Sequence, residues 1–156
     1  MEYDLVKKVW LALFVSLIAA SSPAAAQNAE VTAAVNRFID GYNKGDAKLL
    51  ASSCAAQTSI IDEFPPHEWH GANACLTWLK DYNIDAKKNG ITDGAVIAGK
   101  PSHVDVTGDR AYVVVPSDYT YKEKGTPIRE VGSSWTFALR KGQSGWRITG
   151  WSWSKK

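Results

Sequence analysis

The hydrophobic pattern changes once along the chain, and that change limits the folds the chain can adopt. Up to about residue 90, apolar side chains recur every three or four residues, the spacing of amphipathic helices. Beyond Asn89-Gly90 the chain becomes a series of segments rich in Val, Ile, Tyr, Trp and Thr, separated by glycine-containing turns that are typical of antiparallel strands. Helices followed by strands predict an α+β domain, in which the helices cover one face of the sheet.

The spacing predicts three helices, followed by a meander of strands. The helices are expected at residues 29–44, 46–54 and 72–87. A strand over 58–64 and a loop over 67–71 separate the second helix from the third. The later strands are expected at 91–99, 103–106, 110–122, 128–140 and 146–153, with Pro116 marking a bulge or bend. A long, bent sheet covered by helices leaves room for a cavity between the two layers.

The N-terminal segment has the features of a secretory signal peptide. Lys7 and Lys8 precede an apolar run over 9–20, and Pro23 and small residues follow that run. This run of twelve residues falls short of the roughly 20 that span a bilayer. We predict cleavage after Ala26, which divides the chain into a leader (1–26) and a single domain (27–156). The protein is then periplasmic or secreted and does not contact the membrane after cleavage; the alternative is an uncleaved membrane anchor.

Cys54 and Cys75 are the only cysteines. In an oxidising compartment such a pair can form a disulfide, and the alternative is two buried thiols on helix faces. Sequence alone leaves both open, because it does not place the two Cα atoms. Neither residue adjoins a His or lies in a CxxC motif, so a catalytic cysteine is not expected.

The charge balance argues against nucleic-acid binding. Lys and Arg number 18 and Asp and Glu 16, a formal net charge of +2. A nucleic-acid-binding protein would show a basic stripe, or basic residues interleaved with stacking aromatic rings, whereas the arginines here are scattered. We therefore expect no nucleic-acid partner.

Several short motifs, taken in order, resemble a known superfamily. They are RFIDGYNKGD over 37–46, Ile61-Asp62 and His70-Gly71. Their order over residues 29–153 is similar to that of the nuclear transport factor 2-like superfamily, above all its SnoaL-like and ketosteroid-isomerase-like members. The resemblance implies a cone-shaped, curved antiparallel sheet covered by three N-terminal helices, with a pocket at the wide end and often a dimer through the sheet. It implies no single activity, because this fold hosts isomerases, cyclases, dehydratases and non-catalytic proteins.

The resemblance also argues against steroid isomerisation. Ketosteroid isomerases use a carboxylate base, together with a Tyr and a protonated Asp that donate hydrogen bonds to a developing oxyanion. By the resemblance, Asp62 falls at the position of the base. Phe38 occupies the position of the tyrosine, and Trp135 that of the second aspartate. Since losing one such donor typically costs about 10²–10³ in rate, we do not expect this activity.

The residues themselves favour an apolar pocket with Asp62 at its mouth. A carboxylate against apolar surface has a raised pKa and can act as a general base. A solvated Asp62 in a turn, and Tyr42 packed with its hydroxyl at the surface, are the alternatives. His70, hydrogen-bonded near Asp62, is a second candidate catalytic residue. The expected lining comes from the helices and the late strands: Phe38, Tyr42, Trp78, Leu79, Tyr119, Trp135 and Trp151.

The spacing of His67 and His70, with Asp62, Glu63 and Glu68 nearby, raises the question of a metal site. A structural zinc site needs four convergent ligands, and the remaining histidine lies on a distant strand. We therefore expect no metal and no cofactor, and interpret His70-Gly71 as the approach to the third helix.

Aromatic residues on the last strand bear on oligomeric state. Strict alternation over 146–153 places Trp151 and Trp153 on one face and Trp146 and Ile148 on the other. Large aromatics on both faces predict that both are covered, which favours a homodimer through the sheet. The alternative is a monomer whose outer face is shielded by Lys and Arg side chains.

Three functions remain after these exclusions. The first, which we favour, is a module that binds a small hydrophobic ligand without catalysis. The second is an enzyme of the isomerase, cyclase or dehydratase type, with Asp62 as general base on a small carbonyl or polyketide-like substrate. The third is a subunit that associates with another protein through its sheet face. The environment of Asp62 distinguishes the two pocket functions from the third.

Overall fold

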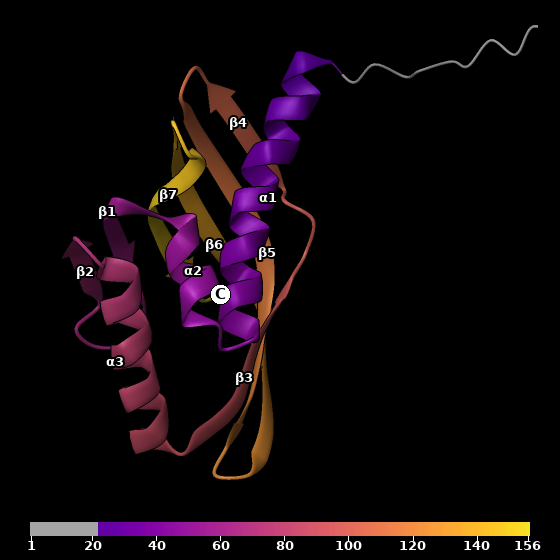
Figure 1. The fold of residues 1–156 in the computed structure, drawn as a ribbon. Helices are drawn as coiled ribbons and strands as arrows, with labels where there is room; N and C mark the ends of the chain where they lie inside the picture. The colour runs from indigo at the N-terminus through magenta and orange to yellow at the C-terminus, as the bar shows by residue number, and fades with distance from the viewer. Residues whose placement is uncertain (1–21) are drawn as a thin grey trace, which may run out of the picture.

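The computed structural model describes residues 22–156, and residues 1–21 of the predicted leader lie outside the described residues. Within residues 22–156, three helices and seven strands follow one another (Figure 1). The helices are α1 (Pro23–Asn43), α2 (Ala47–Ser53) and α3 (Ala74–Asn89). The strands are β1 (Cys54–Ile61), β2 (Glu68–Gly71), β3 (Ile91–Ala98), β4 (His103–Thr107), β5 (Arg110–Glu123), β6 (Thr126–Gly142) and β7 (Gly145–Ser154).

Local residue chemistry explains where α1 and α2 begin. The Ser22 side chain accepts a hydrogen bond from the Ala25 amide at 3.2 Å, and Pro23 suits the first helical position, so α1 begins six residues before the predicted start. Gly45, with φ of +63°, follows α1 and allows the chain to turn. Asp46 then caps α2 through the Leu49 amide at 2.9 Å, as its sequence position predicts.

The α+β architecture is confirmed: the three helices lie across one face of a curved sheet (Figure 1). The strand order is β2-β1-β7-β6-β5-β3, and β4 also pairs with β5. Two features differ from the expected antiparallel meander. β1 lies parallel to β7, and residues 68–71, expected in a loop, form β2 against β1. A short strand with a single apolar residue, Trp69, carries too little alternation to be recognised from sequence.

A bulge in β7 overturns the predicted assignment of its faces. Ala138 pairs with Gly150 while Leu139 pairs with Ile148, so Thr149 is an extra residue in β7. Side chains before and after the bulge therefore face the same side, and Trp146, Ile148 and Trp151 are all buried in the same core. The tryptophans do not occupy two opposite faces. The sequence argument for a sheet-mediated homodimer loses its basis, and the dimer stays a prediction.

The core lies between α1 and the sheet. Phe38, which is fully buried, packs its ring against Trp135, Phe137 and Trp151 at centroid distances of 5.4, 5.9 and 5.8 Å. α1 and α2 approach closely at Gly41, where an added Cβ would lie 2.5 Å from the Leu50 amide nitrogen. No larger side chain fits at Gly41 without separating the two helices.

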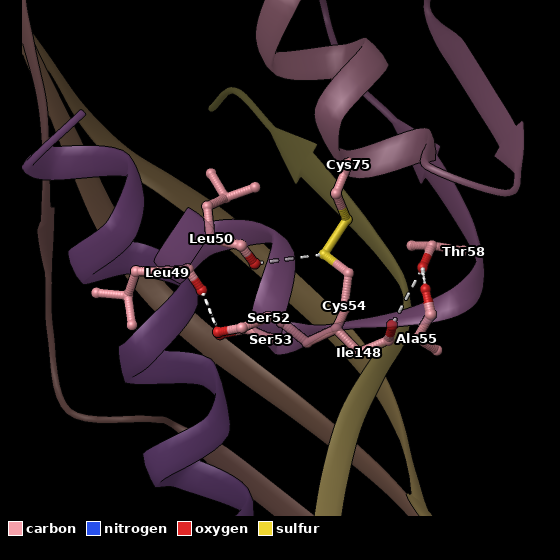
Figure 2. The surroundings of a disulfide bond; sticks show 9 residues. All are labelled: Leu49, Leu50, Ser52, Ser53, Cys54, Ala55, Thr58, Cys75 and Ile148. Atoms are coloured by element: carbon pink, nitrogen blue, oxygen red, sulfur yellow. Dashed lines mark hydrogen bonds between the residues drawn. A yellow bond between two sulfur atoms is a disulfide. The ribbon is translucent and has the colours of Figure 1, made fainter. Parts of the chain in front are cut away.

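A disulfide joins Cys54, at the junction of α2 and β1, to Cys75 in the first turn of α3 (Figure 2). The Cα atoms are 6.7 Å apart, within the range that a disulfide spans. The bond therefore fixes the N-terminal end of α3 against the sheet.

No helix within residues 22–156 has the length and apolar content required to cross a membrane.

Candidate functional site

A cavity of about 380 Å³ lies between α3, the end of α1 and the sheet. This volume is at the lower end of the range of about 300–1,000 Å³ for small-molecule sites. Five of the residues predicted to form the site line it: Tyr42, Asp62, Trp78, Tyr119 and Trp135. They come from α1, the segment after β1, α3, β5 and β6, so residues far apart in sequence converge on one space.

Asp62 follows the last residue of β1 and lies in the cavity wall. Its amide donates to the His67 carbonyl at 3.0 Å, which closes the turn over 62–67. Its carboxylate accepts two hydrogen bonds of 2.7 Å, from the Trp78 indole to Oδ2 and from the Glu63 amide to Oδ1. These two donors hold the carboxylate in one orientation.

Burial raises the pKa of Asp62 to about 6, against the hydrogen bonds from Trp78 and Glu63, which lower it. The desolvation of the charged form is therefore the larger effect. A carboxyl group with a pKa close to neutral can both accept and release a proton at physiological pH. The structure thus favours the half-buried Asp62 over the solvated one.

Three tyrosine hydroxyls converge in the cavity. Tyr42 donates to the Tyr119 oxygen at 3.2 Å, and the hydroxyls of Tyr82 and Tyr119 form a short hydrogen bond. Burial raises the pKa of Tyr42 and of Tyr119, so both remain protonated at neutral pH. The three hydroxyls, one each from α1, α3 and β5, form a cluster that can donate a hydrogen bond to a ligand oxygen.

Gly94 in β3 makes this tyrosine cluster possible. A Cβ at position 94 would lie 2.5 Å from the Tyr119 hydroxyl oxygen and 2.6 Å from that of Tyr82. Both distances are shorter than any contact a carbon atom tolerates. Only glycine lets β3 pass this close to the hydroxyls.

Charged side chains form the rim of the cavity. Lys155, after β7, contacts Glu63 Oε2 at 3.0 Å and Glu130 Oε1 at 2.9 Å. The Tyr121 hydroxyl also donates to Glu130 Oε1, at 3.0 Å. Lys155 thereby links the turn after β1 to β6 across the cavity edge.

Three of the predicted lining residues lie elsewhere. Phe38 and Trp151 are buried in the core behind the cavity wall, because each is enclosed by other aromatic rings. Leu79, one residue after Trp78 on α3, points to a second hollow between α1, α3 and β3. The prediction that these three line the cavity is wrong.

His70 does not act with Asp62. Residues alternate along β2, with Trp69 buried and His70 exposed. The imidazole lies 3.2 Å from Ser59 Oγ and 3.2 Å from Glu68 Oε2 on the outer surface. The histidine beside Asp62 is instead His67, whose Nδ1 lies 3.3 Å from the Asp62 carbonyl oxygen. Within residues 22–156, no group of three His, Cys, Asp or Glu side chains is arranged to hold a metal ion.

Sequence reasoning missed several lining residues. Tyr82 of α3 lines the cavity, and its spacing of four residues from Trp78 on the predicted third helix could have placed it at the site. Trp153 shares the inward face of β7. Glu130 and Lys155 carry no local signal, because their role depends on contacts between distant segments.

Trp135, a residue of the cavity lining, has a buried polar group without a partner among the described residues. The Trp135 side chain is 2% exposed, and its indole N–H has no hydrogen-bond partner among the described residues. A buried donor without a partner is costly, and a ligand acceptor would remove that cost. Trp146 and Trp151 also have buried indole N–H groups without partners among the described residues, but neither of these two residues lines the cavity.

Comparisons with known proteins agree with this architecture. A family model described as a SnoaL-like domain matches residues 31–155. A search of curated proteins finds no significant match.

Solved structures with similar folds include an NTF2-like superfamily protein from Salmonella enterica serovar Typhimurium, with a TM-score of 0.70 and 18% identity over 85% of this chain and 92% of that one. An NTF2-like protein with a cystatin-like fold from Novosphingobium aromaticivorans gives a TM-score of 0.67 and 18% identity, covering 83% and 82% of the two chains. A ketosteroid isomerase-like protein from Erwinia carotovora gives a TM-score of 0.60 and 19% identity, covering 83% of this chain and 95% of that one. At these identities the likeness establishes the fold alone.

Proposed function

The chain belongs to the SnoaL-like family, and from the geometry of its cavity we propose that it binds a small, largely apolar ligand that carries an oxygen atom. One observation carries the proposal: an aromatic cavity of about 380 Å³ is lined by a cluster of tyrosine hydroxyls and by Trp135, whose buried indole N–H has no partner within residues 22–156. Apolar walls supply affinity, and the few polar groups orient the ligand.

Ligand binding can be tested with a pair of matched variants. Trp135→Phe removes the indole N–H but keeps an aromatic ring, and we expect it to weaken oxygen-bearing ligands found in a thermal-shift screen by about fivefold to tenfold, the effect of one lost hydrogen bond. Trp146→Phe is the control, because Trp146 is also 2% exposed but does not line the cavity. Equal affinities for Trp135→Phe and the unaltered protein would contradict the proposal, as would a screen without any ligand.

Catalysis by Asp62 is a second candidate function. It is favoured by the pKa of about 6 and by the two hydrogen bonds that fix the carboxylate in the cavity wall. Asp62 would accept a proton from a carbon next to a carbonyl group, while the tyrosine cluster would donate a hydrogen bond to the carbonyl oxygen as negative charge develops. The cluster would then take the place of the tyrosine and aspartic acid donors of ketosteroid isomerases, at whose positions Phe38 and Trp135 stand in this chain.

If Asp62 is the general base, replacing it should lower turnover strongly and change ligand affinity little. Asp62→Asn should lower turnover of an enolisable carbonyl substrate at least about a hundredfold, because general base catalysis typically contributes 10²–10⁴. Ligand affinity should change only a few-fold, since the amide retains the shape of the carboxylate. Steady-state kinetics and a binding titration on the same protein measure the two effects. Unchanged turnover would exclude Asp62 as the base.

Export, cleavage after Ala26 and a sheet-mediated homodimer remain part of the proposal. The disulfide between Cys54 and Cys75 supports export, because such bonds persist mainly in oxidising compartments. Association through the sheet face would have to use exposed apolar residues such as Ile97 and Val131 rather than the buried tryptophans.

A further inference from the structure

The walls of the cavity are aromatic on several sides. Trp78 and Tyr82 of α3 stack with ring centroids 5.9 Å apart, and Phe64 lies 6.0 Å from Tyr82. Tyr119 and Tyr121 of β5, which also line the cavity, stack with ring centroids 5.1 Å apart. Aromatic faces attract organic cations that come within about 6 Å of the ring centre, and several such faces together form an aromatic cage.

The charges that line the cavity are opposite in sign to the net charge of the protein. Asp62, Glu63, Asp85 and Glu130 contribute four carboxyl groups, and Lys155 contributes one ammonium group. With all five ionised the lining carries a formal charge of −3, in a chain whose net charge is +2. In a cleft with low-dielectric walls, such a local excess raises the concentration of cations and repels anions.

The contacts of Lys155 leave one carboxylate oxygen without a partner. Lys155 contacts Glu63 Oε2 and Glu130 Oε1, and Tyr121 donates to the same Glu130 oxygen. The other oxygen, Glu130 Oε2, is buried and has no hydrogen-bond partner among the described residues. A buried carboxylate oxygen without a donor is unfavourable, and a positively charged group beside it would compensate for that cost.

From these three observations we infer that the ligand of the cavity is an organic cation, either a protonated amine or a quaternary ammonium compound, with its positive charge between the aromatic faces and Glu130. The inference rests on the proposed function and specifies the charge of its ligand. A metal ion does not fit, because residues 22–156 contain no group of three His, Cys, Asp or Glu side chains arranged to hold one. An anionic ligand would lie against the carboxylates.

Two probes of the same shape separate charge from apolar contact. Benzyltrimethylammonium carries a positive nitrogen, and neopentylbenzene has a carbon atom in its place. Binding of each to the purified protein at pH 7.5 can be followed by tryptophan fluorescence, since Trp78, Trp135 and Trp153 line the cavity. We expect the cation to bind at least about tenfold more tightly than its neutral counterpart.

Charge variants assign that preference to the cavity lining. Glu130→Gln should reduce the preference for the cation several-fold while leaving the affinity for neopentylbenzene unchanged. Lys155→Met removes the ammonium group that Lys155 contributes to the lining and should raise the affinity for the cation several-fold. Lys156→Met, the control, makes the same change of charge one residue further on, outside the lining, and should have little effect.

The outcomes distinguish the inference from the proposed function. Equal or tighter binding of neopentylbenzene overturns the inference and leaves an apolar binding site. If Glu130→Gln and Lys155→Met both leave the preference unchanged, the cation does not bind beside these groups and the inference is again wrong. If neither probe binds and the thermal-shift screen also finds no ligand, the proposed function and the inference fail together.

Discussion

Gly94→Ala should weaken ligand binding at least about tenfold, although it adds only one methyl group. The new Cβ would lie 2.5 and 2.6 Å from the hydroxyl oxygens of Tyr119 and Tyr82. Either these hydroxyls move into the cavity or β3 moves away from them, and both changes disturb the tyrosine cluster. Overpacking of this kind also lowers the free energy of unfolding, here by about 2 kcal/mol. Calorimetric titration and denaturant unfolding measure the two effects.

Two further variants test this explanation. Gly142→Ala is the control: an added Cβ there would meet no atom within 4 Å, so affinity and stability should stay unchanged. Tyr119→Phe in the Gly94→Ala background removes one of the two clashing oxygens and should restore part of the lost stability. Full ligand affinity in Gly94→Ala would show that the tyrosine cluster does not contact the ligand.

Removing the disulfide should lower the free energy of unfolding by about 3 kcal/mol. Cys54 and Cys75 are 21 positions apart in sequence, and the bond restricts the unfolded chain over that loop. The bond also holds the first turn of α3, one turn before Trp78, which orients Asp62. We therefore expect the double variant Cys54→Ser/Cys75→Ser to unfold at a clearly lower urea concentration than the unaltered protein.

Reductant provides the matched control for the disulfide. The unaltered protein unfolded in the presence of dithiothreitol should approach the stability of the double variant, and the double variant itself should not respond to dithiothreitol. Identical unfolding midpoints for the unaltered protein with and without dithiothreitol would show that the two cysteines do not form the bond in solution.

The order of the secondary structure elements follows from the sequence because each element has its own local signals. The caps at Ser22 and Asp46 and the glycines that end α1 and α3 lie within a few residues of the backbone groups they affect. The family motifs fix the arrangement further. β2 and the parallel pairing of β1 with β7 could not be predicted, because they depend on contacts between separate segments.

The candidate site could be predicted in part, for a related reason. Asp62, Tyr42 and Trp78 lie on elements whose positions follow from periodicity, and all three line the cavity. The alternation rule failed for β7 because Thr149 bulges out of the strand, so Trp146 and Ile148 share the buried face with Trp151. Lys155 and Glu130 meet only once the sheet has curved, so no local pattern indicates the charged rim.

The central claim is that the folded chain holds the Asp62 carboxylate in the wall of an aromatic cavity, where burial disfavours its ionised form. Carboxyl ¹³C NMR of protein labelled at its aspartates measures this directly, with the Asp62 resonance identified by its loss in Asp62→Asn. The structure predicts a titration midpoint of about pH 6. A midpoint near the ordinary aspartate value of about 3.9 would place the carboxylate in bulk water and contradict the account.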